Sequence, residues 1–384
     1  MRILACLSEA YVKNCDNYYA KPTSALFLQE VFGKDNIFVV SPYEDGSPPT
    51  GWSSHVSSKN FFGVPKFDSI KSFVLRSIRD PSYLKRYIHR CNEIIDNQEC
   101  DFVWVRNPSL GSLIFALCAL KKDKKLVNHM CANAMQGWKN DKYSKKEKIL
   151  GLAFSFVIRY LAKKISSHRN TINLCTGDVL YKFCKKFSVN THQFVDLLVQ
   201  PNQILLGDSS NTICSSFLFI GRLQADKGIF ELCEAFSSPE LKNLSLSVAG
   251  DGSEYAYLKS KYKNVEFLGQ ISHSELSNVI NRTDCIVVPS KNSYEGFPRV
   301  IMEAWSYGKP VIVSDAGGVK AFVIDKENCL LLKSVSKQSI TKAVKCIHQD
   351  TALYKELASG ARDMKHVSDK NYWFSVLENV IYEK

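Results

Sequence analysis

Two carboxylates in the second half of the chain, Glu295 and Glu303, stand eight residues apart around the sequence Gly-Phe-Pro-Arg-Val-Ile-Met. Carboxylates accept hydrogen bonds from hydroxyl groups and pair with cations. Glu295 precedes a predicted helix and Glu303 lies more than one turn inside it, so the two side chains cannot share one helical face. The spacing therefore predicts that they contact different parts of one ligand.

Two basic residues, Arg222 and Lys227, lie in a loop between a short hydrophobic run at 217–220 and an amphipathic pattern from Ile229 to about Phe236. The pattern predicts a buried parallel strand, a basic loop and a helix, an arrangement typical of an anion site. Facing a diphosphate, each charge-assisted contact would contribute about 1.5 to 3 kcal/mol. The alternative interpretation is that both side chains are simply solvated.

Further strands and turns surround these residues. A strand at 244–249 is closed by Gly250 and Gly252, which permit a sharp turn into a helix. A strand at 265–268 is followed by Gln270 and Ile271, in a loop that could pack a nucleobase, and then by a helix. A strand at 285–288 leads to Pro298, predicted in the first turn of the next helix. The free backbone N–H groups at that helix start favour an anion.

The first half repeats the alternation of strands and helices, which predicts a doubly wound α/β sheet. His129 ends one of its strands, at the carboxyl edge where open α/β sheets bind ligands. An alternative is that His129 caps local backbone groups. The predicted strands of this half are residues 2–7, 36–40, 101–105, 125–128, 171–174 and 194–198.

Four motifs now combine into a recognisable order: Gly221-Arg222 with Lys227-Gly228, Gly250-Asp251-Gly252, Glu295-Gly-Phe-Pro with Glu303, and residues 308–318. Their order and spacing resemble the C-terminal half of retaining glycosyltransferase family 4 enzymes, with their E-x7-E motif. The resemblance implies the GT-B fold, an α/β architecture of two Rossmann-like doubly wound lobes facing a central cleft. It implies an acceptor-side lobe over 1–205, joined by a C-terminal helix at about 369–384 that crosses back, and a nucleotide-sugar-binding lobe over 206–368.

The resemblance also implies roles for individual residues. Arg222 and Lys227 would hold the donor diphosphate, Glu295 would meet hydroxyls of the donor sugar, Glu303 would bind the ribose, and His129 would lie near the donor sugar. The catalytic set is then Glu295, Arg222, Lys227 and His129. The donor-binding set is Gly221, Arg222, Lys227, Gly252, Gln270, Ile271, Glu295, Gly296, Phe297, Pro298, Arg299, Val300 and Glu303.

The implied activity is transfer of a sugar, with retention and without a metal, from a nucleotide-sugar donor to a glycan acceptor. Lipid-linked acceptors of surface polysaccharides such as O-antigen or capsule are expected, because many family members use them. No cofactor and no metal site are expected, since the nucleotide-diphosphate sugar is a substrate and the sequence contains no Asp-x-Asp. A same-fold enzyme acting on a small soluble acceptor, such as a sugar phosphate, is the alternative.

Two positions depart from the family pattern. The loop after the first strand, residues 8–23, contains no glycine where many members have a Gly-Gly pair. Its aromatic and hydroxyl side chains indicate either a lid that shapes the acceptor site or an ordinary surface loop. After Gly317 and Gly318, many relatives carry a Glu where this chain has Ala321, so that contact with the donor is expected to be missing or replaced.

Charge separates the two halves of the 384-residue chain. Residues 1–200 carry 29 Lys and Arg against 17 Asp and Glu, while residues 201–384 carry 21 of each, so the net charge of +12 belongs to the first half. A basic nucleic-acid-binding protein is therefore a remote alternative. We expect no nucleic-acid partner, because the basic residues lack regular aromatic interleaving and the second-half motifs would stay unexplained.

The basic excess gathers at residues 139–186, with 12 basic and 3 acidic side chains around the apolar run 149–158. That run is too short to span a bilayer, which needs about 20 apolar residues. We expect Leu152, Phe156 and Ile158 in the core and the basic rim on an anionic membrane surface. The competing interpretation is a core helix with a solvated rim.

Location is predicted from the cysteines and from the first residues. Thirteen cysteines without a Cys-x-x-Cys pair indicate free thiols in a reducing cytoplasm, and residues 2–7 read as a strand rather than a signal peptide. The expected location is therefore cytoplasmic, peripheral on the cytoplasmic face of the inner membrane.

Overall fold

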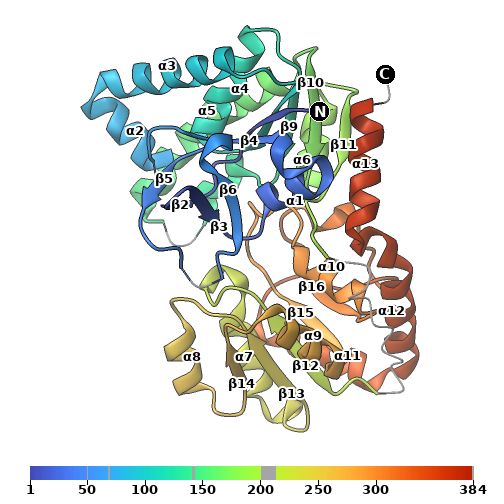
Figure 1. Ribbon diagram of the computed structural model, residues 1–384. Helices are drawn as coiled ribbons and strands as arrows, with labels where there is room; N and C mark the ends of the chain where they lie inside the picture. The colour runs from blue at the N-terminus through green and yellow to red at the C-terminus, as the bar shows by residue number, and fades with distance from the viewer. Residues whose placement is uncertain (50, 68–69, 141–142, 200–212, 383–384) are drawn as a thin grey trace. The chain divides into compact units, whose positions relative to one another are not determined.

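The computed structural model describes residues 1–49, 51–67, 70–140, 143–199 and 213–382. Its chain divides into two compact units (Figure 1). The first unit comprises Met1–Lys139, Tyr143–Leu198 and the chain from Val376; the second comprises Asn140 and the chain from Val199 to Ser375. The predicted boundary at 205/206 lies outside the described residues.

The first unit is built on a seven-stranded parallel sheet of order β11-β10-β9-β8-β1-β4-β7. Its strands read as nearly continuous hydrophobic runs because both faces of the sheet are covered. Leu4, Val103 and Val105 are fully buried on one face, in a core to which α3, α4, α5 and α6 contribute. The strands are β1 Ile3–Cys6, β4 Ile37–Ser41, β7 Phe61–Gly63, β8 Phe102–Asn107, β9 Leu126–Met130, β10 Thr171–Cys175 and β11 Thr191–Gln193.

Helices of the first unit begin at defined caps. Asp80 caps α3, Ser109 caps α4, and Ser144 forms a capping box with Glu147 at the start of α5. Such caps satisfy backbone N–H groups that have no partner inside the helix. The helices are α1 Ser24–Phe32, α2 Ile70–Arg79, α3 Pro81–Asn97, α4 Leu110–Lys121, α5 Lys145–Ser166 and α6 Asp178–Lys185.

A small second sheet of order β5-β2-β3-β6 belongs to the same unit (blue in Figure 1). It comprises β2 Tyr11–Asn14, β3 Asn17–Ala20, β5 Tyr43–Asp45 and β6 Ser54–Ser57. The glycine-free segment after β1, predicted as a lid or surface loop, thus forms an antiparallel hairpin. Cys15 makes its tight turn with a φ of 51°. Its aromatic residues Tyr11 and Tyr18 are buried against Phe61.

The second unit is built on a six-stranded parallel sheet of order β14-β13-β12-β15-β16-β17. Its strands are β12 Ser216–Ile220, β13 Ser245–Ala249, β14 Glu266–Gly269, β15 Cys285–Val288, β16 Val311–Ser314 and β17 Leu330–Leu332. Its helices are α7 Ile229–Phe236, α8 Tyr255–Lys261, α9 His273–Arg282, α10 Arg299–Ser306, α11 Lys337–Gln349, α12 Thr351–Asp363 and α13 Lys370–Tyr382. The residues of α13 from Val376 onward group with the first unit.

Most predicted strands are confirmed within one or two residues, but the one at 194–198 is wrong. The strand β11 comprises Thr191–Gln193, and the chain leaves the sheet after Phe194. There the N–H of Leu197 donates to the carbonyl of Val195, which folds the chain too tightly for a strand. The segment is nevertheless buried, so its apolar pattern records burial rather than extension.

Helix α5 buries fewer apolar side chains than predicted. Ile158 is buried as predicted, but Leu152 and Phe156 are 39% and 66% exposed. The helix packs on the unit through a narrow stripe of Ser155, Ile158, Ala162 and Ile165, and Phe156 directly follows Ser155, so it turns away from that stripe. Apolar side chains on the outer face of α5 are therefore left in solvent. We call this set the α5 outer face: Ile149, Leu150, Leu152, Phe156, Val157 and Tyr160.

Candidate functional site

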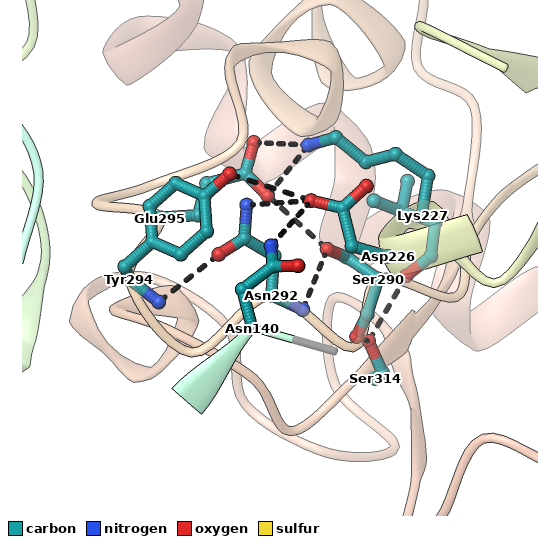
Figure 2. A network of polar contacts seen from close by, with 9 residues as sticks. Asn140, Asp226, Lys227, Ser290, Asn292, Tyr294, Glu295 and Ser314 are labelled. Atoms are coloured by element: carbon teal, nitrogen blue, oxygen red, sulfur yellow. Dashed lines mark hydrogen bonds and ion pairs between the residues drawn. The ribbon is translucent and has the colours of Figure 1, made fainter. Parts of the chain in front are cut away.

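The predicted site centres on an ion pair between Lys227 and Glu295 (Figure 2). Lys227 Nζ lies 2.7 Å from Glu295 Oε1 and 2.8 Å from Oε2, and both side chains are largely buried, at 15% and 24% exposure. Lys227 lies just before α7, and Glu295 lies in the loop between β15 and α10. Both loops follow the carboxyl ends of strands, β12 and β15, which are neighbours in the sheet. Parallel strands bring such loops to one edge.

A network of neutral polar groups holds this pair. Ser290 Oγ donates to Glu295 Oε2 at 3.2 Å, and Ser314 Oγ donates to the carbonyl of Ser290 at 2.5 Å. Ser290 follows β15 and Ser314 ends β16. Neither serine was predicted as a site residue, although both stand at strand ends of the same sheet edge. Ser290 thus shares Glu295 Oε2 with Lys227, and Ser314 holds the backbone of Ser290.

Asp226 organises a second part of the network (Figure 2). Its Oδ2 accepts hydrogen bonds of 3.4 Å from Asn140 Nδ2, Asn292 Nδ2 and Tyr294 Oη. Asn292 in turn accepts from the N–H of Tyr294 at 3.0 Å. These residues were also missed. Asp226, Asn292 and Tyr294 lie next to or near motif residues, which could have indicated them, but nothing in the sequence indicated Asn140. Together they order the loop that carries Glu295.

Two glycines are required by close backbone contacts at this site. A Cβ at Gly228, which has a φ of +68°, would lie 2.0 Å from the carbonyl oxygen of Pro289. A Cβ at Gly317, with a φ of +64°, would lie 2.4 Å from the carbonyl oxygen of Glu295. The N–H of Gly318 donates to the carbonyls of Glu295 and Gly296. The Gly-Gly turn therefore supports the Glu295 backbone directly.

The side chain of Arg222 differs from that of Lys227: it has no hydrogen bond or ion pair within the described part of the chain, and it is exposed. It follows Gly221 directly at the end of β12. A guanidinium in this position can bind an anion without first breaking an internal contact. The loop thus carries one cation that is paired with a carboxylate, Lys227, and one whose side chain is exposed, Arg222.

The start of α10 lies beside Glu295 in the chain. The helix begins at Arg299, and Pro298 is its cap residue with φ −66° rather than a residue of its first turn. Gly296, Phe297 and Pro298 are buried, while Arg299 and Val300 are half-buried. Phe297 packs edge-on against Phe322 at 5.1 Å between ring centroids. This packing fixes the helix start whose N–H groups were predicted to face an anion.

The remaining predicted donor residues belong to the second unit as well. Glu303 is half-buried on α10 and lines a cavity of about 10 Å³ with Leu276, Ser277 and Ile280 of α9. Gln270 is exposed and Ile271 half-buried directly after β14. Gly252 approaches the carbonyl oxygen of Leu223 so closely that a Cβ would lie 2.5 Å away.

His129 belongs to the first unit and is fully buried at the end of β9. Its Nε2 shares a hydrogen bond of 3.2 Å with Thr176 Oγ1, and its ring meets Trp104 and Phe194 edge-on. The position at the carboxyl edge is the predicted one. Because His129 is buried, it can contact a ligand directly only if its neighbours move. Otherwise it can affect a ligand only through the groups that it contacts.

An additional polar cluster at this edge was not selected from the sequence. Glu9 follows β1, and its Oε1 accepts from Thr23 Oγ1 at 2.7 Å and from the N–H of Ser24 at 3.2 Å. Asp196 accepts from Ser24 Oγ at 2.5 Å and lies 3.9 Å from Arg106 Nε. Burial raises the pKa of Glu9, while the charge of Arg106 opposes the rise. Carboxylates and a guanidinium therefore meet where β1 and β8 end.

Part of the second unit, including Lys227 and Glu295, is similar to known proteins. Residues 215–364 match the family model described as "Glycosyl transferases group 1". The chain is 35% identical over 127 residues to the putative teichuronic acid biosynthesis glycosyltransferase TuaC of Bacillus subtilis, covering 33% of this chain and 31% of that protein. It is 32% identical over 123 residues to a lipopolysaccharide 1,2-N-acetylglucosaminetransferase of Salmonella typhimurium, covering 28% and 32%. The chain thus spans about a third of the length of these relatives.

The fold of the whole chain also has solved counterparts. The Anabaena protein Alr3699/HepE in complex with UDP-glucose aligns with a TM-score of 0.62 and 17% identity, covering 99% of each chain. At this identity the likeness concerns the fold, two Rossmann-like parallel sheets of the GT-B type. The predicted fold class is confirmed. The chain has a fold of the GT-B type, and its residues 215–364 match the model of group 1 glycosyl transferases.

Proposed function

We propose that this protein is a retaining, metal-independent glycosyltransferase that moves a sugar from a nucleoside-diphosphate sugar to a lipid-linked glycan acceptor in surface polysaccharide biosynthesis. The observation that carries the proposal is the Lys227–Glu295 ion pair beside the available Arg222, within the matched domain. The relatives from teichuronic acid and lipopolysaccharide synthesis support the acceptor class.

The donor would occupy the carboxyl edge of the second unit. Arg222 and Lys227 supply two positive charges for the diphosphate, and the N–H groups at the start of α10 add partial positive charge. Preorganised cations stabilise charge that develops on the leaving diphosphate, which is often the largest contribution to catalysis. HepE was solved with UDP-glucose, so UDP-glucose is the first donor to test.

Donor binding would exchange the partners of the ion pair. Lys227 turns from Glu295 to the diphosphate, and Glu295 becomes free to accept hydrogen bonds from sugar hydroxyls. Glu303 accepts from the ribose. The bond from the anomeric carbon to the diphosphate oxygen then breaks, and the acceptor oxygen bonds to that carbon on the same face. The acceptor's proton passes to the departing diphosphate oxygen, so atoms and charge balance without an enzymatic nucleophile.

The donor part of the proposal is tested by thermal shift and hydrolysis with a panel of nucleotide sugars. We expect stabilisation by at least one of them in wild type, and loss of it in Lys227→Ala. Lys345→Ala is the matched control, because Lys345 forms an exposed pair with Glu240 at 2.9 Å elsewhere in the same unit. No stabilisation of wild type by any nucleotide sugar would contradict the proposal.

The membrane part of the proposal depends on the α5 outer face. Ile149, Phe156 and Tyr160 are 71%, 66% and 64% exposed, and they recur at helical spacing. Lys145, Lys146 and Lys164 are exposed on the same helix. An amphipathic helix with a basic rim binds anionic lipid surfaces, each nearby cation contributing about 1 kcal/mol. No helix in the described part of the chain is long and apolar enough to cross a bilayer.

Liposome flotation separates this proposal from the alternative of a small soluble acceptor. We expect the protein to float with vesicles that contain anionic lipid and to remain at the bottom with purely zwitterionic vesicles at moderate salt. Remaining at the bottom with both kinds of vesicle would favour a soluble acceptor such as a sugar phosphate.

A further inference from the structure

A groove of about 620 Å³ opens in the first unit, and none of the predicted site residues lines it. Its walls come from the small sheet, from the end of β7 and from helix α3. Gly63 ends β7, the edge strand that lies two places beyond β1 in the seven-stranded sheet. The volume falls within the range of small-molecule sites. The lining residues are Tyr18, Tyr43, Phe61, Gly63, Val64, Pro65, Arg86, His89, Arg90 and Glu93.

The floor of the groove is aromatic and ordered. Tyr18 stacks on Phe61 with ring centroids 3.8 Å apart and planes at 8°, and Tyr43 stands edge-on to Tyr18 at 5.1 Å. A Cβ at Gly63 would lie 2.6 Å from Tyr43 Cε1, so the ring keeps this position only because residue 63 has no side chain. The hydroxyl groups of Tyr18 and Tyr43 have no hydrogen-bond partner among the described residues.

The opposite wall is a polar face of α3. Arg86, His89, Arg90 and Glu93 recur at spacings of three and four residues, which places them on one side of the helix. Arg90 is held at two points: its Nε donates to the carbonyl of Gly63 at 3.1 Å, and its Nη1 lies 3.0 Å from Glu93 Oε1. Held in this way, the guanidinium keeps its Nη2 hydrogens for a ligand at little cost in side-chain entropy.

This combination of groups fits a sugar ring better than an apolar ligand. One face of a pyranose carries C–H groups that pack on the negatively charged face of an aromatic ring. Its hydroxyl groups meet donors and acceptors around the rim, which phenol, imidazole, guanidinium and carboxylate groups supply. Arg90 pairs with Glu93 and Arg86 pairs with Asp80. An acidic substituent on the sugar would gain a charge-assisted hydrogen bond from Nη2 of Arg90.

We propose that this groove is a subsite for an acidic sugar, bearing a carboxylate or phosphate, in a part of the acceptor glycan other than its reacting end. This assignment rests on the proposed function for its biological role. Arg90 and Tyr43 are its main contacts, Gly63 positions Tyr43, and Glu93 positions Arg90.

The test is direct binding, without any sugar transfer, measured by titration calorimetry on the full chain. The probes are tetragalacturonate, a heparin tetrasaccharide and mannose 6-phosphate, with maltotetraose as the neutral counterpart. We expect saturable binding of at least one acidic probe and binding of maltotetraose that is at least about tenfold weaker, since one charge-assisted contact is lost. If no acidic probe binds, or if the neutral probe binds equally well, the assignment is overturned.

Variants locate the binding. Arg90→Ala should weaken it about tenfold, and Tyr43→Ala should weaken it measurably. Arg169→Ala is the control, because Arg169 is an exposed arginine of the same unit whose Nη2 lies 3.5 Å from Asp123. Tyr43→Phe keeps the ring, so this variant tests the hydroxyl group without the risk that the protein fails to fold. Unchanged binding in both Arg90→Ala and Tyr43→Ala, or displacement of the probe by UMP at equal affinity, would overturn the assignment.

Nucleotide-sugar binding is measured on the same proteins. Acidic-sugar binding without nucleotide-sugar binding would refute the proposed function and leave the groove assignment standing. Nucleotide-sugar binding that persists in wild type while every acidic probe fails would refute the groove alone.

Discussion

Lys227 and Glu295, 68 residues apart in the sequence, form a bidentate ion pair in which the ammonium nitrogen is nearly equidistant from the two carboxylate oxygens. Each of these residues was expected to contact a different part of the donor. In the structure, each neutralises the other. A largely buried charge left without its partner is costly, so each of the two side chains stabilises the other in the folded unit.

Removal of the ammonium group should impair transfer, and it should also lower the melting temperature because Glu295 loses its partner. We expect Lys227→Ala to lower kcat/KM about 10- to 100-fold, because one charge-assisted contact of about 1.5 to 3 kcal/mol with the diphosphate is lost. Steady-state kinetics with the preferred nucleotide sugar measure this. Lys345→Ala should keep wild-type kinetics, and a Lys227→Ala protein with normal kinetics would remove Lys227 from the donor site.

Glu303 is predicted to act on donor binding through the ribose. Glu303→Ala should raise the dissociation constant for the nucleoside diphosphate about tenfold or more, because a hydrogen bond to a charged group is lost. Glu303→Gln, which keeps an acceptor oxygen, should lose less. Calorimetric titration with the diphosphate compares the three proteins. Equal affinities throughout would assign Glu303 to local helix packing instead.

The turn at Gly317 offers a test that involves no ligand contact. Gly317→Ala places a methyl group against the Glu295 carbonyl at a positive φ, a strain of about 1 to 3 kcal/mol. We expect a lower melting temperature together with weaker donor binding, since the Glu295 backbone must move. Gly137→Ala is the control, because no atom lies within 4 Å of a Cβ at Gly137. A Gly317→Ala protein with unchanged stability and binding would contradict the supporting role.

The α5 outer face can be tested by changing its polarity. Ile149→Asp combined with Phe156→Asp should abolish flotation with anionic vesicles, because burial of such a side chain contributes about 1.5 to 3 kcal/mol. The folding of the protein should not suffer, as both side chains are exposed. Val189→Asp is the matched control, since Val189 is 87% exposed in the same unit outside α5. Continued flotation of the double variant would exclude this face as the membrane contact.

Glu9 predicts a pH dependence of stability. Burial raises its pKa in the folded state above the value in the unfolded chain. Between these two values the folded state binds more protons than the unfolded state, so the contribution of Glu9 to stability falls as pH rises through this window. Glu9→Gln, which cannot ionise, should therefore melt at a higher temperature than wild type at pH 7, with a difference that shrinks toward pH 4. A difference independent of pH would contradict the raised pKa.

The sequence predicted the second unit well because its motifs stand at strand and helix ends. Helix α7 has the predicted bounds, Ile229–Phe236, and strands β12 to β15 lie within one or two residues of prediction. The contact between Lys227 and Glu295 could not be predicted, since it depends on two loops meeting at one sheet edge. Asp226, Ser290 and Asn292 were missed for the same reason: their role lies in hydrogen bonds between loops.

The first unit was harder to predict because burial and periodicity disagree there. Phe194 is buried outside any strand, and Phe156 is exposed on a helix whose apolar run suggested a core. The hairpin of β2 and β3 carries buried tyrosines, yet its strands of four residues are too short for a clear alternation. Sequence patterns record which residues are apolar, but only the packing partners decide which of them are covered.

Attachment to a membrane through the α5 outer face would have a kinetic consequence. A molecule attached through this helix searches in two dimensions, so its encounters with a lipid-borne acceptor scale with the number of acceptors per unit area. Diluting the suspension of vesicles would then leave the turnover of attached molecules unchanged, whereas diluting the acceptor within each bilayer would slow it.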